Sequence, residues 1–406
     1  MKNVTRREFI KSIAAGGAAW GLGSTVASVA FPRPLYALER TVVSVVAIKK
    51  DNVDYAVRKA IDLLGGIKTL AAGKERIMLK PNLVNFASTD VTKPAVVKAL
   101  AQLMKDAGKE VSIGEGSAAS YQNIRPGIMG GVCRTMDRAT LEILQQSVFD
   151  ALEYTELARS LKIPLINLHT GEMTTVKTPD GFVFKEITLH HTLAETDLLC
   201  SVPMMKTHGL ATVTLGMKNL IGVYPGQVYG TVRSAVHAEA AKVESSGTAS
   251  AVVDMVRTNK LGLVVIDASM AMEGQGPSAG MGGRLVKMDL IIAGTNPLAT
   301  DMVGASVMGF VPEEISTFVW AWKAGMTPGS LDEIEIRGER LSDVRRKFLR
   351  PMVIPYSEMR VWASVLRVSQ AKQDEDATRE QAKPHPRMAA KTQLAEPVIG
   401  KYAGPG

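Results

Sequence analysis

Strand-length apolar runs alternate with helical patterns along most of this chain, and this alternation constrains the fold more than any other feature of the sequence. Residues 41–48, 76–80 and 110–113 are short apolar runs of strand length. Residues 51–64, with Asp51 as the expected cap, and residues 94–107 place apolar side chains at the spacing of one helix face. Because a helix that crosses between two strands joins them in parallel, this order predicts an α/β fold with mostly parallel sheets and crossover helices.

The pattern continues to about residue 335 and predicts one α/β domain, residues 38–335, built as two associated lobes. A chain of 406 residues is long enough for two core-bearing layers. We expect a C-terminal helical extension over residues 336–370 and a disordered tail over the polar residues 371–406. The other expected elements are helices over 140–161, 209–220, 229–246, 248–258 and 297–308, strands over 164–168, 197–202, 261–267, 290–294 and 331–336, a hairpin over 174–189, and Gly-rich loops over 121–138 and 270–284.

The sequence of the N-terminal residues is typical of a targeting segment. Residues 5–11 are TRREFIK and precede a Gly/Ala-rich apolar run, an order similar to a twin-arginine export signal. Residues 12–30 contain four glycines and few large aliphatic side chains, which is unfavourable for a permanent membrane span. We therefore predict a signal peptide over residues 1–37, cleavage after Ala30 or Ala37, recognition by the twin-arginine export machinery and a periplasmic location.

Charge and cysteine content exclude two classes of function. Removing residues 1–37 takes away five Lys/Arg and one Glu, so the net charge falls from +8 to +4. This mildly basic chain has no basic stripe interleaved with aromatic side chains, so nucleic-acid binding is not expected. Cys133 and Cys200 cannot supply four ligands, so no intrinsic iron–sulfur cluster is expected either. Cys200 lies in an apolar strand pattern typical of a buried core residue, with a disulfide to Cys133 as the alternative.

Polar side chains follow the first parallel strands at the point where each strand ends. Lys80 and Asn82 end one strand, and Glu115 lies between two glycines at the end of the next. Because the carboxyl ends of parallel strands meet at one edge of a sheet, these residues are candidates for ligand binding. Glu115 could act as a proton acceptor or metal ligand. The alternative interpretations are structural. Lys80 would bury only its aliphatic stem, Asn82 would form a local turn, and Glu115 would be a surface carboxylate.

The richest cluster lies in residues 200–226, CSVPMMKTHGLATVTLGMKNLIGVYPG. It contains Lys206, His208, Lys218 and Asn219, with Lys206 and His208 expected in a turn after the strand that Pro203 ends. Such groups can neutralise an anionic ligand, hold a metal through the imidazole, or react through a desolvated amine. The competing interpretation is a solvated loop before an ordinary helix.

Further candidates come later in the chain. Asp267 ends a buried strand, and Asp301 lies in the helix over residues 297–308, where the helix dipole alone would also favour an acid. His237 is a candidate because histidine is the commonest metal ligand. Adjacent strand residues point to opposite faces, so His190 and His191 are expected to be structural.

Several of these motifs resemble those of the domain-of-unknown-function 362 family. They are Lys80-Pro81-Asn82-Leu83, Gly114-Glu115-Gly116, Lys206-Thr207-His208, Lys218-Asn219, Tyr224-Pro225-Gly226, and residues 267–280 with Asp301 downstream. The resemblance covers about residues 41–335. It implies the family's fold and implies no particular reaction.

A second resemblance is to the nickel-pincer lactate racemases. His208, Lys218 and Pro225-Gly226 follow the order and spacing of that family's histidine, lysine and Pro-Gly, and residues 90–94 are similar to its Asp-x-Thr-Arg-Pro motif. There the lysine anchors an organometallic nucleotide cofactor and the histidine serves the metal. This chain departs from the pattern at residues 116–118, where Gly-Ser-Ala replaces Gly-x-His.

These observations support three hypotheses. The first is an exported enzyme or cofactor-dependent protein that acts on a small anionic ligand, with Lys218, His208 and Glu115 in catalysis, His208 on any metal, and the other candidates binding the ligand. The second is a non-catalytic protein that binds a metal or an anion at the same residues. The third is an accessory of an iron–sulfur redox complex, with a redox partner that supplies the cluster.

Overall fold

The computed structural model describes residues 40–118, 137–230, 233–245 and 247–353, and the chain from Arg40 onward clusters as one compact unit. The expected signal peptide, most of the loop over 121–138, Cys133 and the expected C-terminal tail lie outside the described residues. Within the described residues, no helix has the length and apolar character needed to cross a bilayer.

The described residues build a ten-stranded sheet in the order β12-β1-β11-β10-β7-β2-β3-β4, with β8 paired to β10 and β9 to β8. Most neighbouring strands are parallel, whereas β1–β11, β10–β11 and β8–β9 are antiparallel. The strands are β1 Thr41–Ala47, β2 Arg76–Pro81, β3 Glu110–Glu115, β4 Leu165–Asn167, β7 Leu198–Val202, β8 Met204–His208, β9 Thr212–Thr214, β10 Leu261–Gly274, β11 Gly283–Gly294 and β12 Ile334–Gly338. The predicted α/β class with a mostly parallel sheet is confirmed, and these strands form one continuous sheet.

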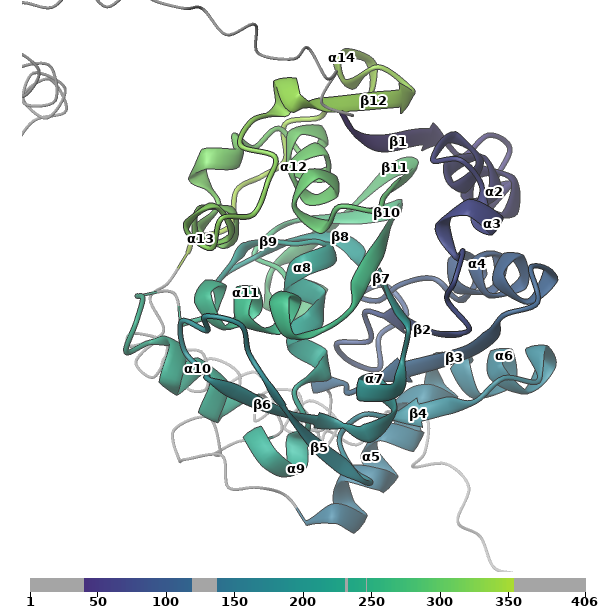
Figure 1. The fold of residues 1–406 in the computed structure, drawn as a ribbon. Coiled ribbons are helices and arrows are strands. Elements are labelled where there is room, and N and C mark those ends of the chain that lie inside the picture. Colours follow the sequence, from purple (N-terminus) through teal and green to yellow (C-terminus); the bar gives the residue numbers. More distant parts are fainter. Residues whose placement is uncertain (1–39, 119–136, 231–232, 246, 354–406) are drawn as a thin grey trace, which may run out of the picture. The chain divides into compact units, whose positions relative to one another are not determined.

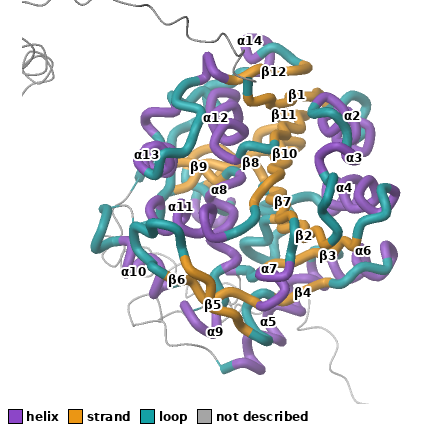
Figure 2. The backbone as a smooth tube through the Cα atoms, viewed as in Figure 1, coloured by secondary structure: helices purple, strands orange, loops and turns teal. Residues whose placement is uncertain are grey.

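Helices cover both faces of this sheet, as Figures 1 and 2 show. One apolar core lies beneath α2 (Val53–Leu63), α3 (Ile67–Leu70), α4 (Pro94–Asp106) and α6 (Tyr154–Leu161). The other lies beneath α8 (Gly216–Asn219), α11 (Ala249–Thr258), α12 (Pro297–Val307) and α13 (Ser316–Lys323). Because both faces are covered, strands such as β7 are buried along their whole length, as the continuous apolar runs predict. Cys200 of β7 is a fully buried free thiol, in agreement with the core assignment.

The remaining elements surround this three-layer arrangement. The predicted hairpin forms from β5 (Met173–Lys177) and β6 (Glu186–His190) as a separate two-stranded sheet. The other helices are α5 Arg138–Ala151, α7 His191–Glu195, α9 Gly226–Tyr229, α10 Ser234–Ala240 and α14 Leu341–Val344, with 3₁₀ turns η3 Leu220–Val223, η4 Ala279–Met281, η5 Pro312–Glu314 and η6 Leu331–Glu333.

Two helix boundaries differ from the prediction for local reasons. The cap of α2 is Asn52, whose side chain accepts the backbone N–H of Tyr55 at 3.0 Å, while Asp51 has a φ of 55°. The single helix expected over residues 140–161 is two helices, α5 and α6, because Glu153 adopts a left-handed φ of 63° between them.

The larger differences lie around the candidate site. Lys206 is within β8 and not in a turn, because the chain resumes strand pairing with β10 after Pro203. The helix expected over residues 209–220 is β9 followed by the short α8. Asp267 lies inside β10, which continues to Gly274 and pairs with β11, so a hairpin replaces much of the irregular loop expected over 270–284.

Candidate functional site

A buried ion pair joins the ends of β2 and β3. The Lys80 ammonium lies 2.8 and 2.9 Å from the two carboxylate oxygens of Glu115, and both side chains are buried. The ammonium also donates to the Pro81 carbonyl at 2.9 Å, and Glu115 accepts the backbone N–H groups of Leu83 and Gly116. A buried ion pair is stable only when its remaining hydrogen-bonding groups are satisfied, as they are here. This saturation favours a structural role for Glu115 over the catalytic role expected from the sequence.

Asn219 connects the ion pair to α8. Its Oδ1 accepts from Lys80 Nζ at 3.1 Å and from Asn82 Nδ2 at 3.2 Å. Its Nδ2 donates to Lys80 O and to Ser201 Oγ, each at 3.0 Å. Lys80, Asn82, Glu115 and Asn219, all singled out from the sequence, therefore meet in one network at the carboxyl edge of the sheet. Asn82 Oδ1 is buried without a hydrogen-bond partner among the described residues.

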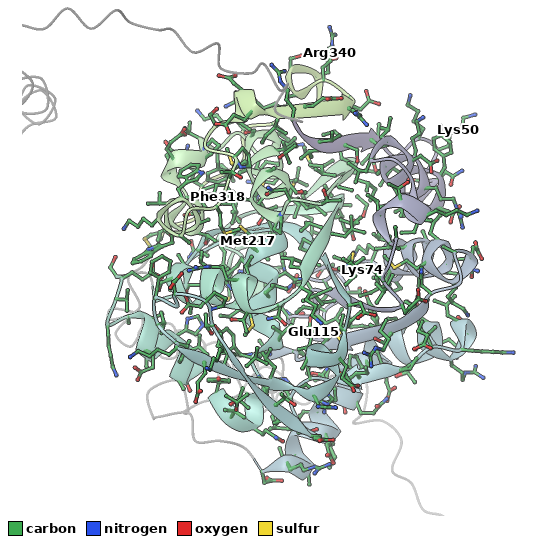
Figure 3. The ribbon with its side chains drawn as sticks, in the orientation of Figure 1. Lys50, Lys74, Glu115, Met217, Phe318 and Arg340 are labelled. Atoms are coloured by element: carbon green, nitrogen blue, oxygen red, sulfur yellow. The ribbon has the colours of Figure 1, made fainter. Side chains whose placement is uncertain are left out.

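Two glycines lie beside this network at positions where neighbouring atoms leave no room for a side chain. A Cβ on Gly222 would lie 2.6 Å from Glu115 Oε1 and 2.8 Å from Lys80 Nζ. A Cβ on Gly116 would lie 2.8 Å from both the Arg233 guanidinium and the Gly222 carbonyl. These separations are too short for any side chain, so the ion pair and its backbone cover require glycine at both positions. Figure 3 shows Glu115 and Met217 in the interior and Lys50 and Arg340 at the periphery.

Lys206 and Lys218 are further buried lysines, and neither forms an ion pair within the described residues. Lys206 donates to the backbone carbonyl of Asp90 at 2.7 Å. Lys218 is 7% exposed and has no hydrogen-bond partner in the described part of the chain. Burial is the main cause that lowers the pKa of each lysine to about 7. The positive charges of Arg233 and Lys80 lower the pKa of Lys218 further. The pKa of Lys206 is raised by the negative charge of Asp90 and lowered by the positive charge of Lys218.

His208 ends β8 beside these cations. Its Nδ1 accepts the backbone N–H of Leu210 at 3.0 Å, which places the proton of the neutral ring on Nε2. Burial is the main cause that lowers its pKa well below 6.5, and the charges of Lys218 and Lys206 lower it further. The ring is therefore neutral near pH 7, and its cationic neighbours show that positive charge is concentrated here.

His237 lies in α10 near the same lysine. Its Nδ1 contacts the Gly247 carbonyl at 2.7 Å. Burial, and then the charge of Lys218, lower its pKa to about 4. His237 therefore belongs to the surroundings of Lys218 as a neutral ring.

His169 and Arg233 are two buried residues of the site for which the sequence predicted no role. Both are buried and join the end of β3 to the segment after α8. His169 Nε2 lies 2.7 Å from Ser117 O, its Nδ1 accepts the Gly226 N–H at 3.0 Å, and burial is the main cause that lowers its pKa to about 3. The Arg233 guanidinium donates to backbone carbonyl groups, those of Gly116, Ser117, Gly222 and Tyr224. The strand-end rule could have found His169, since it follows β4 at the same edge.

The two candidate carboxylates hold backbone segments. Asp267 is fully buried and accepts from the Lys93 N–H at 2.8 Å and from the Ser269 hydroxyl at 2.6 Å, and burial raises its pKa. Asp301 accepts the N–H groups of Gly216 and Met217 at 2.7 and 2.8 Å. These contacts fix the loop before α4 and the start of α8.

The described residues do not provide a set of side chains that could hold a metal ion without other ligands. Across the described ranges, no group of three or more His, Cys, Asp or Glu side chains is placed to hold a metal ion. The cations around His208 would also repel a metal ion. His190 and His191 contact different partners, Thr192 and Thr174, in agreement with their expected structural role.

A family model described as "Domain of unknown function (DUF362)" matches residues 77–306, more than half of the chain. The thylakoid-associated protein sll1697 of Synechocystis sp. is 27% identical over 276 residues, which cover 67% of this chain and 75% of that protein.

Among solved structures, the lactate racemase apoprotein from Thermoanaerobacterium thermosaccharolyticum matches with a TM-score of 0.39 and 14% identity. The match covers 66% of this chain and 57% of the racemase chain. A likeness at this level supports no conclusion about cofactor or reaction.

Proposed function

The chain belongs to the DUF362 family, whose description names no activity, and we propose from the site itself that the protein binds a small anionic ligand at Lys206, Lys218 and His208. In this proposal Lys218 also exchanges a proton with the ligand. The proposed ligand is a carboxylate or an oxyanion of similar size.

Lys218 carries this proposal. It is buried, lacks a partner among the described residues, and lies close enough to Arg233 and Lys80 for their charges to lower its pKa. A buried ammonium without a counterion is unfavourable by several kcal/mol, and a bound anion would remove that cost. Lys80 provides the contrast, because the fold itself supplies Glu115 at 2.8 Å.

The proposed chemistry follows from the protonation states. An amine with a pKa of about 7 exists in comparable amounts as ammonium and as free amine near neutral pH. Lys218 can therefore donate a proton to an anionic ligand or accept one from it. Lys206, held by the Asp90 carbonyl, would orient the anion, and the Nε2 proton of His208 would donate a hydrogen bond. No metal is needed for these steps.

We also propose that the protein reaches the periplasm through the twin-arginine pathway. The support is the order of residues 5–30, a TRREFIK segment followed by a Gly/Ala-rich apolar run. Export of a folded chain is compatible with a site assembled from β2, β3, β8 and α8, which are distant in sequence.

Calorimetric titration of the purified protein with sulfate and with acetate tests the proposed site. We expect binding accompanied by proton uptake at about pH 8, because an anion raises the pKa of both lysines. Titrations in buffers of different ionisation enthalpy measure that uptake. Lys218→Met should weaken binding at least about tenfold and reduce proton uptake, whereas Lys98→Met, an exposed change on α4, should alter neither.

Three outcomes would count against the proposal or a part of it. Binding of neither anion to the wild type would remove the anion site. Equal affinity in Lys218→Met would assign the lysine to the scaffold. Anion binding without proton uptake would retain a binding protein and exclude the proton-transfer role of Lys218.

A further inference from the structure

Asp301 lies where it can control the orientation of Lys218. It is 1% exposed and lies in α12, which is buried from Leu298 to Val307, and its two oxygens accept the N–H groups of the first two residues of α8. The distances are 2.7 Å to Gly216 N and 2.8 Å to Met217 N. Each carboxylate oxygen thus holds a separate backbone amide, which is the geometry of an ionised carboxylate.

Gly216 permits this contact. A Cβ at that position would lie 2.4 Å from Val264 Cγ1 and 2.9 Å from Asp301 Oδ1. The Gly216 carbonyl also accepts the Ser201 hydroxyl at 2.9 Å. The start of α8 is therefore held from two sides, by α12 and by β7.

Lys218 and Asn219 are the next residues of this short helix, so their side-chain directions depend on how its first turn is held. Asn219 is also fixed by its hydrogen bonds to Lys80, Asn82 and Ser201. Lys218 has no hydrogen bond of this kind in the described chain, so the hydrogen bonds that hold it are those of the α8 backbone.

We propose that Asp301 is a positioning residue, whose ionised carboxylate orients α8 so that the Lys218 amine faces the bound anion. Asp301 does not contact the ligand. A carboxylic acid donates through one oxygen and cannot accept both amides equally well, so protonation of Asp301 would release one of the two N–H groups. This inference rests on the proposed anion site and explains how its central lysine is placed.

The surroundings of Asp301 make this contact sensitive to pH. Burial raises its pKa to about 7, opposed by the two backbone N–H groups, and no charged side chain of the described residues acts on it. The elements packed against α12 are α8, α13, α14, η5, η6, β1, β10 and β11. Burial and the two backbone N–H groups are the causes that shift the pKa of Asp301, and no titratable side chain of these elements is among them: Lys218 on α8, Lys323 on α13, Asp343 on α14, Glu313 and Glu314 on η5, Asp332 and Glu333 on η6, Asp267 and Glu273 on β10, and Arg284, Lys287 and Asp289 on β11. Anion binding should therefore weaken below about pH 7 as Asp301 takes up a proton, and above that pH as Lys218 loses one.

Asp301→Asn tests this role, since it retains one acceptor and replaces the other with an N–H donor. Sulfate is a suitable probe because its charge is constant across the relevant pH range. We expect the wild-type affinity to be greatest near pH 7. Asp301→Asn should bind sulfate at least about tenfold more weakly there and lose the acid-side decline. Asp62→Asn, an exposed change on α2, should leave affinity and profile unchanged.

A second measurement does not require the variant to fold. In the wild type, the amide ¹H and ¹⁵N signals of Gly216 and Met217 should titrate together with a midpoint near pH 7. A flat response across that range, or wild-type affinity and profile in Asp301→Asn, would overturn the positioning role. If the amides titrate but sulfate and acetate never bind, the anion site fails while Asp301 still controls α8.

Discussion

Replacing Lys218 with Met should make the folded protein more stable near neutral pH while removing its proposed function. The substitution keeps an unbranched side chain and eliminates the buried amine. A lysine pKa of about 7 in the fold, against an ordinary value of 10.5, means that folding disfavours the ammonium form. At about 1.4 kcal/mol per pH unit, this cost is roughly 4 kcal/mol at about pH 7 as an upper bound.

The pH dependence identifies the cause. Because the folded-state pKa lies below the unfolded one, the unfolded chain binds more protons between about pH 7 and pH 10.5. The wild type should therefore gain stability as pH rises through this window. The advantage of Lys218→Met should shrink to about 1 kcal/mol at about pH 10, because the folded amine is neutral there and the unfolded amine, although still mostly protonated, is at a pH only about half a unit below its pKa.

Urea unfolding followed by tryptophan fluorescence at about pH 7 and about pH 10 measures both effects. Lys98→Met on the exposed face of α4 controls for the chemical change, and a surface substitution of this kind should stay within about 0.5 kcal/mol. If Lys218→Met destabilises the protein at about pH 7, or stabilises it equally at both pH values, then the Lys218 ammonium does not destabilise the fold and the argument from its burial is wrong. Sulfate should stabilise the wild type and leave Lys218→Met unchanged.

Three other changes test the buried ion pair, the glycine packed against it and the export signal. Glu115→Gln should destabilise the protein by about 3–5 kcal/mol in urea unfolding, because it leaves Lys80 buried without its counterion; a loss below about 1 kcal/mol would contradict the ion pair. Gly222→Ala should cost at least about 2 kcal/mol in the same assay, because its Cβ would meet both ion-pair partners, and an unchanged urea midpoint would refute that contact. Changing Arg6 and Arg7 to Lys should retain full-length precursor in the cytoplasm on cell fractionation, and normal delivery of mature protein would refute the signal assignment.

The local sequence pattern was sufficient to predict the α/β class and the part of the site around Lys80 and Glu115. Lys80 and Glu115 end adjacent parallel strands, so the strand-end rule predicted that they meet, and they do so at 2.8 Å. Asn219 joined them because the segment around α8 returns to the same edge of the sheet. In these cases a few neighbouring residues in the sequence were enough to place each residue at the end of a strand or in a helix.

The rest depended on contacts between distant segments. Lys206 lies in a strand only because β10, some sixty residues later, offers pairing partners. Asp301 appeared to be an ordinary helix acid, and its bond to the start of α8 spans 85 residues of sequence. His169 and Arg233 were missed because their partners are backbone carbonyl and N–H groups, which carry no sequence pattern.

The contrast between two buried lysines gives the strongest argument for where this protein binds its ligand. Around Lys80 the chain provides a carboxylate, an amide oxygen and a carbonyl, and it leaves Gly222 without a side chain so that these groups fit. Lys218 lies directly before Asn219 of this network and receives no partner from the described chain, although the fold satisfies the buried Lys80 ammonium nearby. A buried amine that destabilises the fold is retained only if something else benefits from it. A bound anion, as proposed, would supply the partner that the described residues do not give Lys218.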